Sequence, residues 1–169
     1  MKVVLAVAIS ADGCISPLLD TRSFEWTSKE DRHHIVELSK QMHVIIMGST
    51  TFQTFKIKRA PPGRRLIVYT HSPSSVTGEN VETTSMEPQE LLRKLADERV
   101  ERVIIEGGAS VYGMYLAANV VDELYVTIEP VLFGKGVHFL QTPLGIRMRL
   151  LEHDTLNDNT VLLHYAIDR

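Results

Sequence analysis

The sequence has one cysteine, one tryptophan and no long apolar run. A single cysteine, Cys14, excludes an internal disulfide and is typical of proteins in reducing compartments. No stretch approaches the roughly 20 apolar residues that span a bilayer. The apolar run at residues 1–6 soon meets Ser10, Asp12 and Gly13 without a clear cleavage signal, so it reads as a first strand. We therefore expect a cytoplasmic protein with no membrane partner.

Several sequence motifs that indicate particular functions are also absent. There is no His-Glu-x-x-His or Cys-x-x-Cys, and His33, His34 and His43 lack metal-ligand spacing, so we expect surface histidines and no metal site. Neither Gly-x-Ser-x-Gly nor Gly-x-Gly-x-x-Gly occurs, which excludes a nucleophile elbow and a standard Rossmann domain. The net charge of -3 gives no support to a nucleic-acid surface.

The 169 residues, 44% of them hydrophobic, fit a single domain that spans residues 1–169. Strands alternate with helices along most of the chain, and the final segments are strands only. Strands are predicted at 3–9, 44–47, 66–70, 102–105 and 123–130, helices at 28–42, from 50, at 88–99 and at 110–119, and a closing hairpin at 147–154 and 160–167. This order predicts an α/β sandwich with a mixed, mostly parallel sheet, helices on both faces and an antiparallel edge.

Two strand-to-helix junctions, at residues 44–51 and 103–112, share one pattern. In each, a buried strand ends in glycine and small hydroxyl residues before a helix begins. Unpaired backbone N–H groups and the helix dipole attract phosphate at such a point, and Gly107 and Gly108 allow close approach to the backbone. Either junction alone is equally well an ordinary tight turn, but two on one sheet favour a dinucleotide with several phosphates.

The helix at 28–42 places a carboxylate on its apolar face. The apolar stripe, spaced i, i+4, i+7 and i+11, consists of Asp31, Ile35, Leu38 and Met42, and a separate polar stripe of Glu30, His34, Glu37 and Gln41 should face solvent. Asp31 could simply cap the helix with Ser28. Alternatively, Thr27 and Glu30 form the cap and leave Asp31 free to bind a cationic or amidine-like group. Both possibilities stay open.

The ordered set of motifs resembles dihydrofolate reductase and its structural relative, the pyrimidine reductase domain of riboflavin synthesis. The resemblance covers nearly the whole chain. It rests on residues 5–9 followed by 14–16, Trp26 five residues before Asp31, residues 47–52, Pro62-Gly63-Arg64, Gly107-Gly108 before Val111-Tyr112, and residues 124–127. The resemblance implies a three-layer α/β/α sandwich in which NADPH reduces 7,8-dihydrofolate to tetrahydrofolate, a step of one-carbon metabolism.

The resemblance also implies roles for individual residues. Asp31 would bind the pterin and favour its protonation, Thr127 would orient Asp31, and Trp26 would complete the catalytic set. Substrate-binding residues would be Ala8, Asp31, Ile35, Phe52, Arg64 and Thr127, with Arg64 gripping a substrate carboxylate. NADPH would contact Ala8, Ile15, Gly48, Ser49, Thr50, Thr51, Thr70, His71, Ser72, Glu106, Gly107, Gly108, Ala109, Ser110, Val111 and Tyr112. Residues 12–25 would act as a lid.

Some positions depart from dihydrofolate reductase. Ser49 stands where an arginine often touches the NADPH 2′-phosphate, so residues 70–72 would supply that contact and NADPH is less firmly indicated over NADH. Glu106 before the two glycines, together with residues 121–124 and 134–136, is more typical of the riboflavin relatives. The alternative is thus an NADPH-dependent reductase of a ribosylaminopyrimidine phosphate, and a third possibility is a nucleotide-binding module without catalysis. Each would act on a small molecule as a monomer or homodimer.

Overall fold

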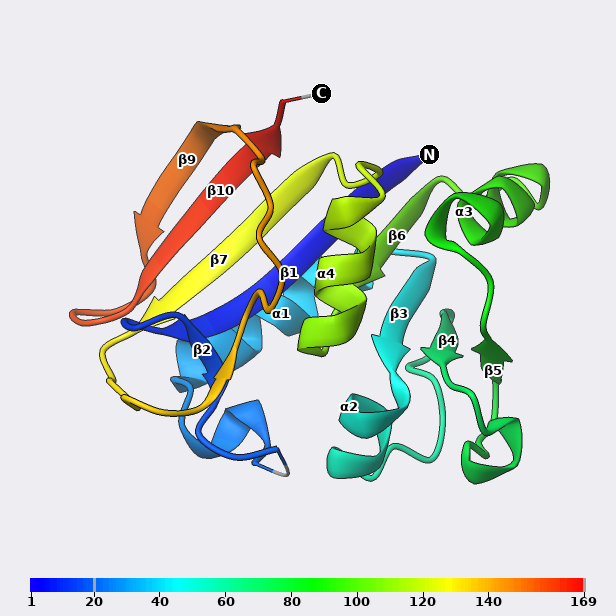
Figure 1. The fold of residues 1–169 in the computed structure, drawn as a ribbon, viewed down its shortest axis with the longest axis horizontal. Helices are drawn as coiled ribbons and strands as arrows, with labels where there is room; N and C mark the ends of the chain where they lie inside the picture. The colour runs from blue at the N-terminus through cyan, green and yellow to red at the C-terminus, as the bar shows by residue number, and fades with distance from the viewer. Residues whose placement is uncertain (20, 169) are drawn as a thin grey trace.

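The computed structural model describes residues 1–19 and 21–168 and is built around an eight-stranded sheet (Figure 1). The strands of this sheet lie in the order β5-β4-β3-β6-β1-β7-β10-β9. Their bounds are β1 Lys2–Ser10, β3 Val44–Gly48, β4 Arg65–Tyr69, β5 Val81–Thr84, β6 Arg102–Ile105, β7 Glu123–Glu129, β9 Met148–Thr155 and β10 Val161–Ile167. The strands from β5 to β7 pair in parallel, and β10 pairs antiparallel with β7 and β9. The expected fold class is confirmed.

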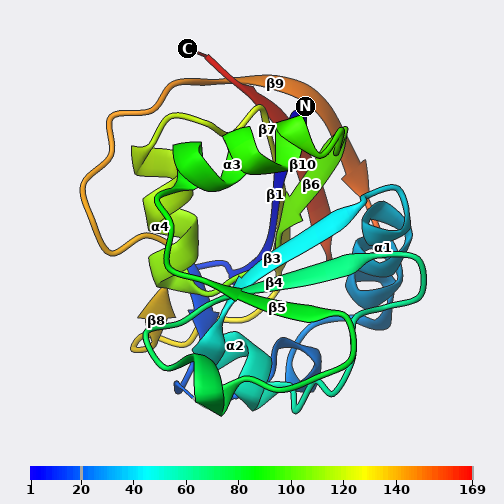
Figure 2. The same cartoon turned by 90° about the vertical axis from the view of Figure 1, so that its right-hand side faces the viewer.

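Helices cover both faces of the sheet (Figure 2), because its parallel strands are apolar on both sides. The helices are α1 Lys29–Lys40, α2 Ser49–Thr54, α3 Pro88–Asp97 and α4 Ala109–Ala117, with short 3-10 turns at Ser23–Glu25 and Pro73–Ser75. Alternate residues of β1 serve the two layers: Val3 and Leu5 pack in the cluster with α3 and α4, while Val4 and Ala6 pack in the cluster with α1.

Three short strands of the structure were not predicted from the sequence. β5 has only one strongly apolar residue, Val81, because it is the edge strand and is only half buried. β2 (Cys14–Ser16) and β8 (Val137–His138) form a separate two-stranded ribbon, in segments where no strand is predicted. Strands of two to four residues carry too little periodicity to be recognised without their partners.

The ribbon fastens the start of the expected lid, residues 12–25, of which residue 20 lies outside the described residues. Asp12 accepts hydrogen bonds from the Ser10 hydroxyl at 2.6 Å and from the backbone N–H of Gly134 at 2.6 Å and Phe133 at 3.2 Å. These bonds, the one from Ser10 first, lower the pKa of Asp12 to about 2. The carboxylate is therefore charged at neutral pH and ties this segment to the loop before β8.

The two stripes of α1 lie largely as the spacing predicts. Asp31 and Leu38 are buried, Met42 lies in the core just past the helix, and Ile35 packs against it. The prediction that His34 faces solvent is wrong, because its ring is half-buried against Tyr125, with ring centroids 5.8 Å apart. Within the described part of the chain, no helix is both long and apolar enough to cross a membrane.

Candidate active site

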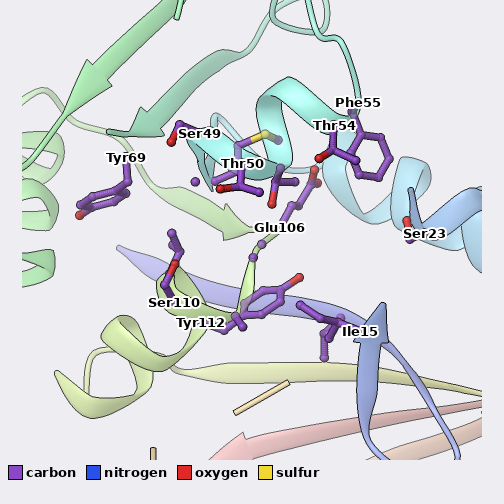
Figure 3. Close-up of a pocket in the computed structure, with 18 of the residues that line it drawn as sticks. Ile15, Ser23, Ser49, Thr50, Thr54, Phe55, Tyr69, Glu106, Ser110 and Tyr112 are labelled. Atoms are coloured by element: carbon purple, nitrogen blue, oxygen red, sulfur yellow. The ribbon is translucent and has the colours of Figure 1, made fainter. Parts of the chain in front are cut away.

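A cavity of about 690 Å³ opens where the parallel strands end. Ligands commonly bind outside the carboxyl ends of strands in such sheets. Figure 3 shows Tyr69 and Ser49 toward one end of the cavity, Ser23 and Ile15 at the other, and Glu106 between them. Most of the predicted site residues line it: Ala8, Ile15, Asp31, Ile35, Gly48, Ser49, Thr50, Thr51, Thr70, His71, Glu106, Gly107, Gly108, Ala109, Ser110, Val111, Tyr112 and Thr127.

The two glycine junctions are bonded to each other and form one wall, the glycine cradle of Gly48, Gly107 and Gly108. The N–H of Gly48 donates to the Gly107 carbonyl at 2.7 Å, and Gly107 has a φ of +127° next to a cis peptide bond to Gly108. A Cβ on Gly48 would lie 3.2 Å from Cγ2 of Val111, and one on Gly108 would lie 3.1 Å from Oγ1 of Thr51. A side chain at either glycine would therefore press against a neighbouring side chain.

The start of α4 suits a phosphate group. Its N-cap, Gly108, provides no side-chain cap, so the N–H groups at the first turn are left for a ligand. Ala109, Ser110 and Val111 of this turn all line the cavity. This uncapped helix end beside the glycine cradle fits the pyrophosphate of a dinucleotide such as NADPH.

Asp31 stands at the other side of the cavity with its carboxyl free of the helix cap. The Ser28 hydroxyl caps α1 by accepting from the backbone N–H of Asp31 at 3.1 Å, while Glu30 accepts from Asn157 at 3.1 Å. Neither alternative for the helix cap is correct as stated. Ser28 caps α1, but the cap uses the backbone N–H of Asp31 and leaves its carboxyl group free. Burial raises the pKa of Asp31, hydrogen bonding from Thr127 opposes this, and negative Glu129 adds to it.

Glu129 was not among the predicted site residues, yet its hydrogen bonds to Ser28 hold the start of α1. One carboxylate oxygen accepts from the N–H of Ser28 at 2.7 Å and from its hydroxyl at 2.8 Å, and the other accepts from Thr160 at 3.0 Å. Glu129 is only 3% exposed, and each of these bonds crosses between segments distant in sequence. It fixes α1, and with it Asp31, to the sheet.

Glu106 brings a second carboxyl to the cavity. Its Oε1 is inaccessible to solvent and has no hydrogen-bond partner among the described residues. Burial raises the pKa of Glu106 to about 7, although the charge of Arg64 and hydrogen bonding from Ser39 act in the opposite direction. A carboxyl group with a pKa near 7 can both hold and release a proton at neutral pH.

Four predicted site residues do not line the cavity: Trp26, Phe52, Arg64 and Ser72. Arg64 donates to the Ser39 hydroxyl at 2.6 Å, so its guanidinium is held against α1. Phe52 belongs to the core beneath α1, and Trp26 packs edge-on against Phe133 at 5.1 Å between centroids. Each of these residues was chosen from a short sequence motif. The direction of its side chain, however, depends on contacts with other segments of the chain, which the motif does not contain.

Other lining residues were missed by the sequence reading. They include Thr54 and Phe55 at the end of α2, Tyr69 at the end of β4, Ser85 and Met86 after β5, and His34 with Tyr125 near Asp31. Ser85 and Met86 could not be found because β5 itself was not predicted. Tyr69 was recognisable in principle, since it lies one residue before the end of the strand predicted at 66–70, at the edge of the sheet where ligands commonly bind.

With this geometry in hand, the chain can be compared with known proteins. The sequence profile of the RibD C-terminal domain matches residues 1–162. The chain belongs to this family. A curated relative, the uncharacterized protein YwjB of Bacillus subtilis (strain 168), is 24% identical over 157 residues, which is 88% of this chain and 89% of YwjB. The riboflavin biosynthesis protein RibD of Bacillus amyloliquefaciens is 39% identical over 54 residues, 32% of this chain and 15% of that protein.

Solved structures agree on the fold. A pyrimidine reductase-like protein from Corynebacterium diphtheriae has a TM-score of 0.82 at 17% identity, covering 99% of this chain and 92% of that one. A Thermotoga maritima diaminohydroxyphosphoribosylaminopyrimidine deaminase/5-amino-6-(5-phosphoribosylamino)uracil reductase gives 0.78 at 19% identity, and this chain spans 56% of its length. Dihydrofolate reductase from Enterococcus faecalis, complexed with NADP(H), gives 0.76 at 18% identity over 99% and 97% of the two chains.

These findings correct the expected activity. The family is that of the RibD C-terminal domain, so the reduction of dihydrofolate and the role in one-carbon metabolism are wrong, while the riboflavin-type alternative gains support. The position of Arg64 agrees with the correction, because it is not available to grip the carboxylate of a folate tail. The expected cofactor, NADPH, is consistent with a reductase family and with a neighbour solved with NADP(H).

Proposed function

We propose that the protein is a reductase that transfers a hydride from NADPH to a ribosylaminopyrimidine, as in riboflavin biosynthesis. The match to the RibD C-terminal domain over residues 1–162 carries this proposal. The shape of the cavity supports it, since the uncapped start of α4 and the glycine cradle suit a dinucleotide, and the carboxyl groups of Asp31 and Glu106 line the same cavity. NADPH supplies the hydride when it is bound.

The chain's own groups would bind the substrate and supply a proton. Reduction of a carbon–nitrogen double bond needs a hydride at carbon and a proton at nitrogen, and NADPH becomes NADP⁺. Asp31 would accept hydrogen bonds from the amino and ring N–H groups of the pyrimidine, with Thr127 orienting it. Glu106, whose pKa lies at about 7, would hold the proton, because a general acid acts best when its pKa is near the working pH.

A direct assay tests the proposal. Purified protein with NADPH should oxidise the cofactor when given 5-amino-6-ribosylaminouracil in its free or 5′-phosphorylated form, and mass spectrometry should find a product two hydrogens heavier. Dihydrofolate, as the comparison substrate, should give no loss of NADPH absorbance. If NADPH binds but neither form of the pyrimidine is reduced, the proposal fails and a nucleotide-binding module remains.

A further inference from the structure

Glu106 has a fixed backbone and a carboxyl group with an unpaired oxygen. Its backbone N–H donates to the carbonyl of Ile46 at 2.9 Å, so the residue is fixed to β3 just after β6 ends. Its side chain lines the cavity, yet Oε1 is inaccessible to solvent and has no hydrogen-bond partner among the described residues. A buried carboxylate is unfavourable unless a cation or a hydrogen-bond donor meets it. The protonation of Glu106 therefore depends on the groups around it.

Two side chains that do not line the cavity act on Glu106: Ser39 and Arg64. Ser39 lies in the last turn of α1 and is 6% exposed, and Arg64 lies one residue before β4. Nη1 of Arg64 donates to the Ser39 hydroxyl at 2.6 Å. A hydroxyl group has a single proton, so a hydroxyl that accepts from a guanidinium keeps that proton for another acceptor. Burial raises the pKa of Glu106 to about 7, and the charge of Arg64 and hydrogen bonding from Ser39 keep it from rising further.

The other groups near Glu106 do not take over this role. The hydroxyl of Tyr112 in α4 donates to a backbone carbonyl of β1 at 2.9 Å, and burial raises the pKa of Tyr112, so it is neutral. The residues of α2 (Ser49–Thr54) include no titratable side chain. Asp31 lines the cavity from the start of α1 and is itself an acid whose pKa is raised by burial. Among the described residues, Arg64 is therefore the cation whose charge acts on Glu106.

We propose that Arg64 and Ser39 are positioning residues for Glu106: the guanidinium holds the Ser39 hydroxyl, and the hydroxyl orients the carboxyl group and helps to determine whether it carries a proton. The inference rests on the proposed function, in which Glu106 supplies the proton, and adds the groups that prepare it. Ser39 donates to one carboxyl oxygen and leaves Oε1 to carry the proton. Without the charge of Arg64, burial would be opposed less strongly, and Glu106 would become a weaker acid that is poorly matched to neutral pH.

This assignment gives α1 a part in both carboxyl groups of the proposed site. The helix carries Asp31 at its start and Ser39 near its end. It is held at both places, because the N–H of Ser28 donates to Glu129 at 2.7 Å and Arg64 donates to Ser39 at 2.6 Å. A shift of α1 would therefore disturb the two acids together.

Carbon-13 NMR of the glutamate side-chain carboxyl groups measures the protonation of Glu106 directly, in protein without ligand or turnover. Glu106→Gln removes one signal and so assigns it. Arg64→Gln removes the cation, so the titration midpoint of Glu106 should move about one pH unit higher, as expected for the loss of a nearby opposite charge. Arg64→Lys keeps the charge and should leave the midpoint close to that of the wild-type protein. An unmoved midpoint in Arg64→Gln, with native thermal unfolding, overturns the inference.

Two further variants separate the Ser39 hydroxyl from a general effect of charge. Ser39→Ala removes the hydroxyl proton and should also raise the midpoint, by less than Arg64→Gln does. Arg65→Gln makes the same charge change at the adjacent residue, whose guanidinium instead bonds to Glu82 at 2.7 Å, and should leave the midpoint in place. Equal movement in Arg64→Gln and Arg65→Gln, or an unmoved midpoint in Ser39→Ala, would contradict the assigned roles.

Turnover provides a second readout and separates this inference from the proposed function. If the pyrimidine is reduced, turnover should decline as pH rises through the pKa of Glu106, and Arg64→Gln should move this decline to higher pH. KM for the pyrimidine should change little, because Arg64 does not line the cavity. Reduction with an unmoved titration of Glu106 would leave the proposed function standing and remove the inference. A moved titration without reduction would support the positioning of Glu106 and remove the proposed function.

Discussion

The two ends of the cavity are built from different parts of the chain. The glycine cradle is made of backbone: Gly48 donates to Gly107, and the uncapped start of α4 adds its N–H groups. The proposed substrate end is made of side chains: Asp31 from α1, Thr127 from β7 and Glu106 after β6 line the cavity, and Glu129 of β7 holds the start of α1. A backbone site needs only glycine and a helix start, whereas a side-chain site needs particular residues brought together by the fold.

This difference explains why one fold accommodates different substrates. The cradle would recognise phosphate through backbone N–H groups, which depend little on side-chain identity, so such a site can persist wherever the glycines and the helix start persist. The substrate end changes with each substituted side chain, and function therefore cannot be taken from the fold alone. Changes at the two ends should accordingly have separable effects, on chemistry at one and on cofactor affinity at the other.

The largest effect is expected at the side-chain end. Asp31→Asn should lower kcat by about 10²–10⁴-fold, the usual contribution of a positioned acid or base, and leave the affinity for NADPH nearly unchanged. Burial raises the pKa of Asp31, so its charged form costs stability at neutral pH, and the neutral asparagine should unfold at an equal or higher temperature. Steady-state kinetics, cofactor titration and thermal unfolding measure the three quantities.

The neighbouring acid provides the control for this variant. Glu30→Gln changes the same charge one residue away, but Glu30 bonds to Asn157 and does not line the cavity. Its turnover should stay close to that of the wild-type protein. Comparable losses in both variants would mean that net charge near α1 matters and that Asp31 has no specific role.

A smaller effect is expected in the glycine cradle. At Gly107, with φ of +127°, a Cβ would lie 3.3 Å from the Tyr112 hydroxyl and 3.4 Å from Oγ1 of Thr51. A strained backbone of this kind costs about 1–3 kcal/mol, so Gly107→Ala should weaken NADPH binding by about 10- to 100-fold. Fluorescence titration of NADPH measures the change.

Gly113→Ala is the matched control for the cradle. It lies within α4, where a Cβ would make only ordinary contact, 3.8 Å from Oγ1 of Thr142. NADPH affinity should be unaffected, and alanine should slightly favour the helix. If the two alanine variants bind NADPH equally well, the dinucleotide does not depend on the backbone at Gly107.

The same contrast determines what the sequence could predict. Both junctions of the cradle were visible, because a buried strand that ends in glycine before a helix is a local pattern. The inward direction of Asp31 also followed from helical spacing alone. Arg64 could not be placed, because its direction depends on Ser39, which lies 25 residues earlier in the chain.

The remaining errors arise from contacts between distant segments. β2 and β8 are recognisable only as partners of each other, and Ser85 and Met86 reach the cavity only through the position of β5 in the sheet. The substrate was misjudged for a related reason: the motif order reflects the shared fold, while the side chains that distinguish substrates are scattered along the chain.

The smallest expected effect tests how the side-chain end is tuned. Glu129→Gln can preserve the bonds that hold α1, since the amide oxygen can accept from Ser28 and the amide nitrogen can donate to the Thr160 hydroxyl. The substitution removes only the negative charge, one of the causes that raise the pKa of Asp31. The pKa of Asp31 should therefore fall while the geometry is retained.

The sign of the change can be followed in the pH profile of turnover. Since the charged form of Asp31 is proposed to accept hydrogen bonds from the substrate, turnover should rise as pH rises through the pKa of Asp31. Glu129→Gln should move this rise to lower pH, with at most a severalfold gain in turnover at neutral pH. Stability should not fall at neutral pH, because a like charge beside Asp31 is gone, and should be unchanged at acidic pH, where Asp31 is protonated. Glu152→Gln, on the exposed strand β9, should leave the profile in place. A rise that stays at the same pH in Glu129→Gln would show that Glu129 holds α1 in position without changing the pKa of Asp31.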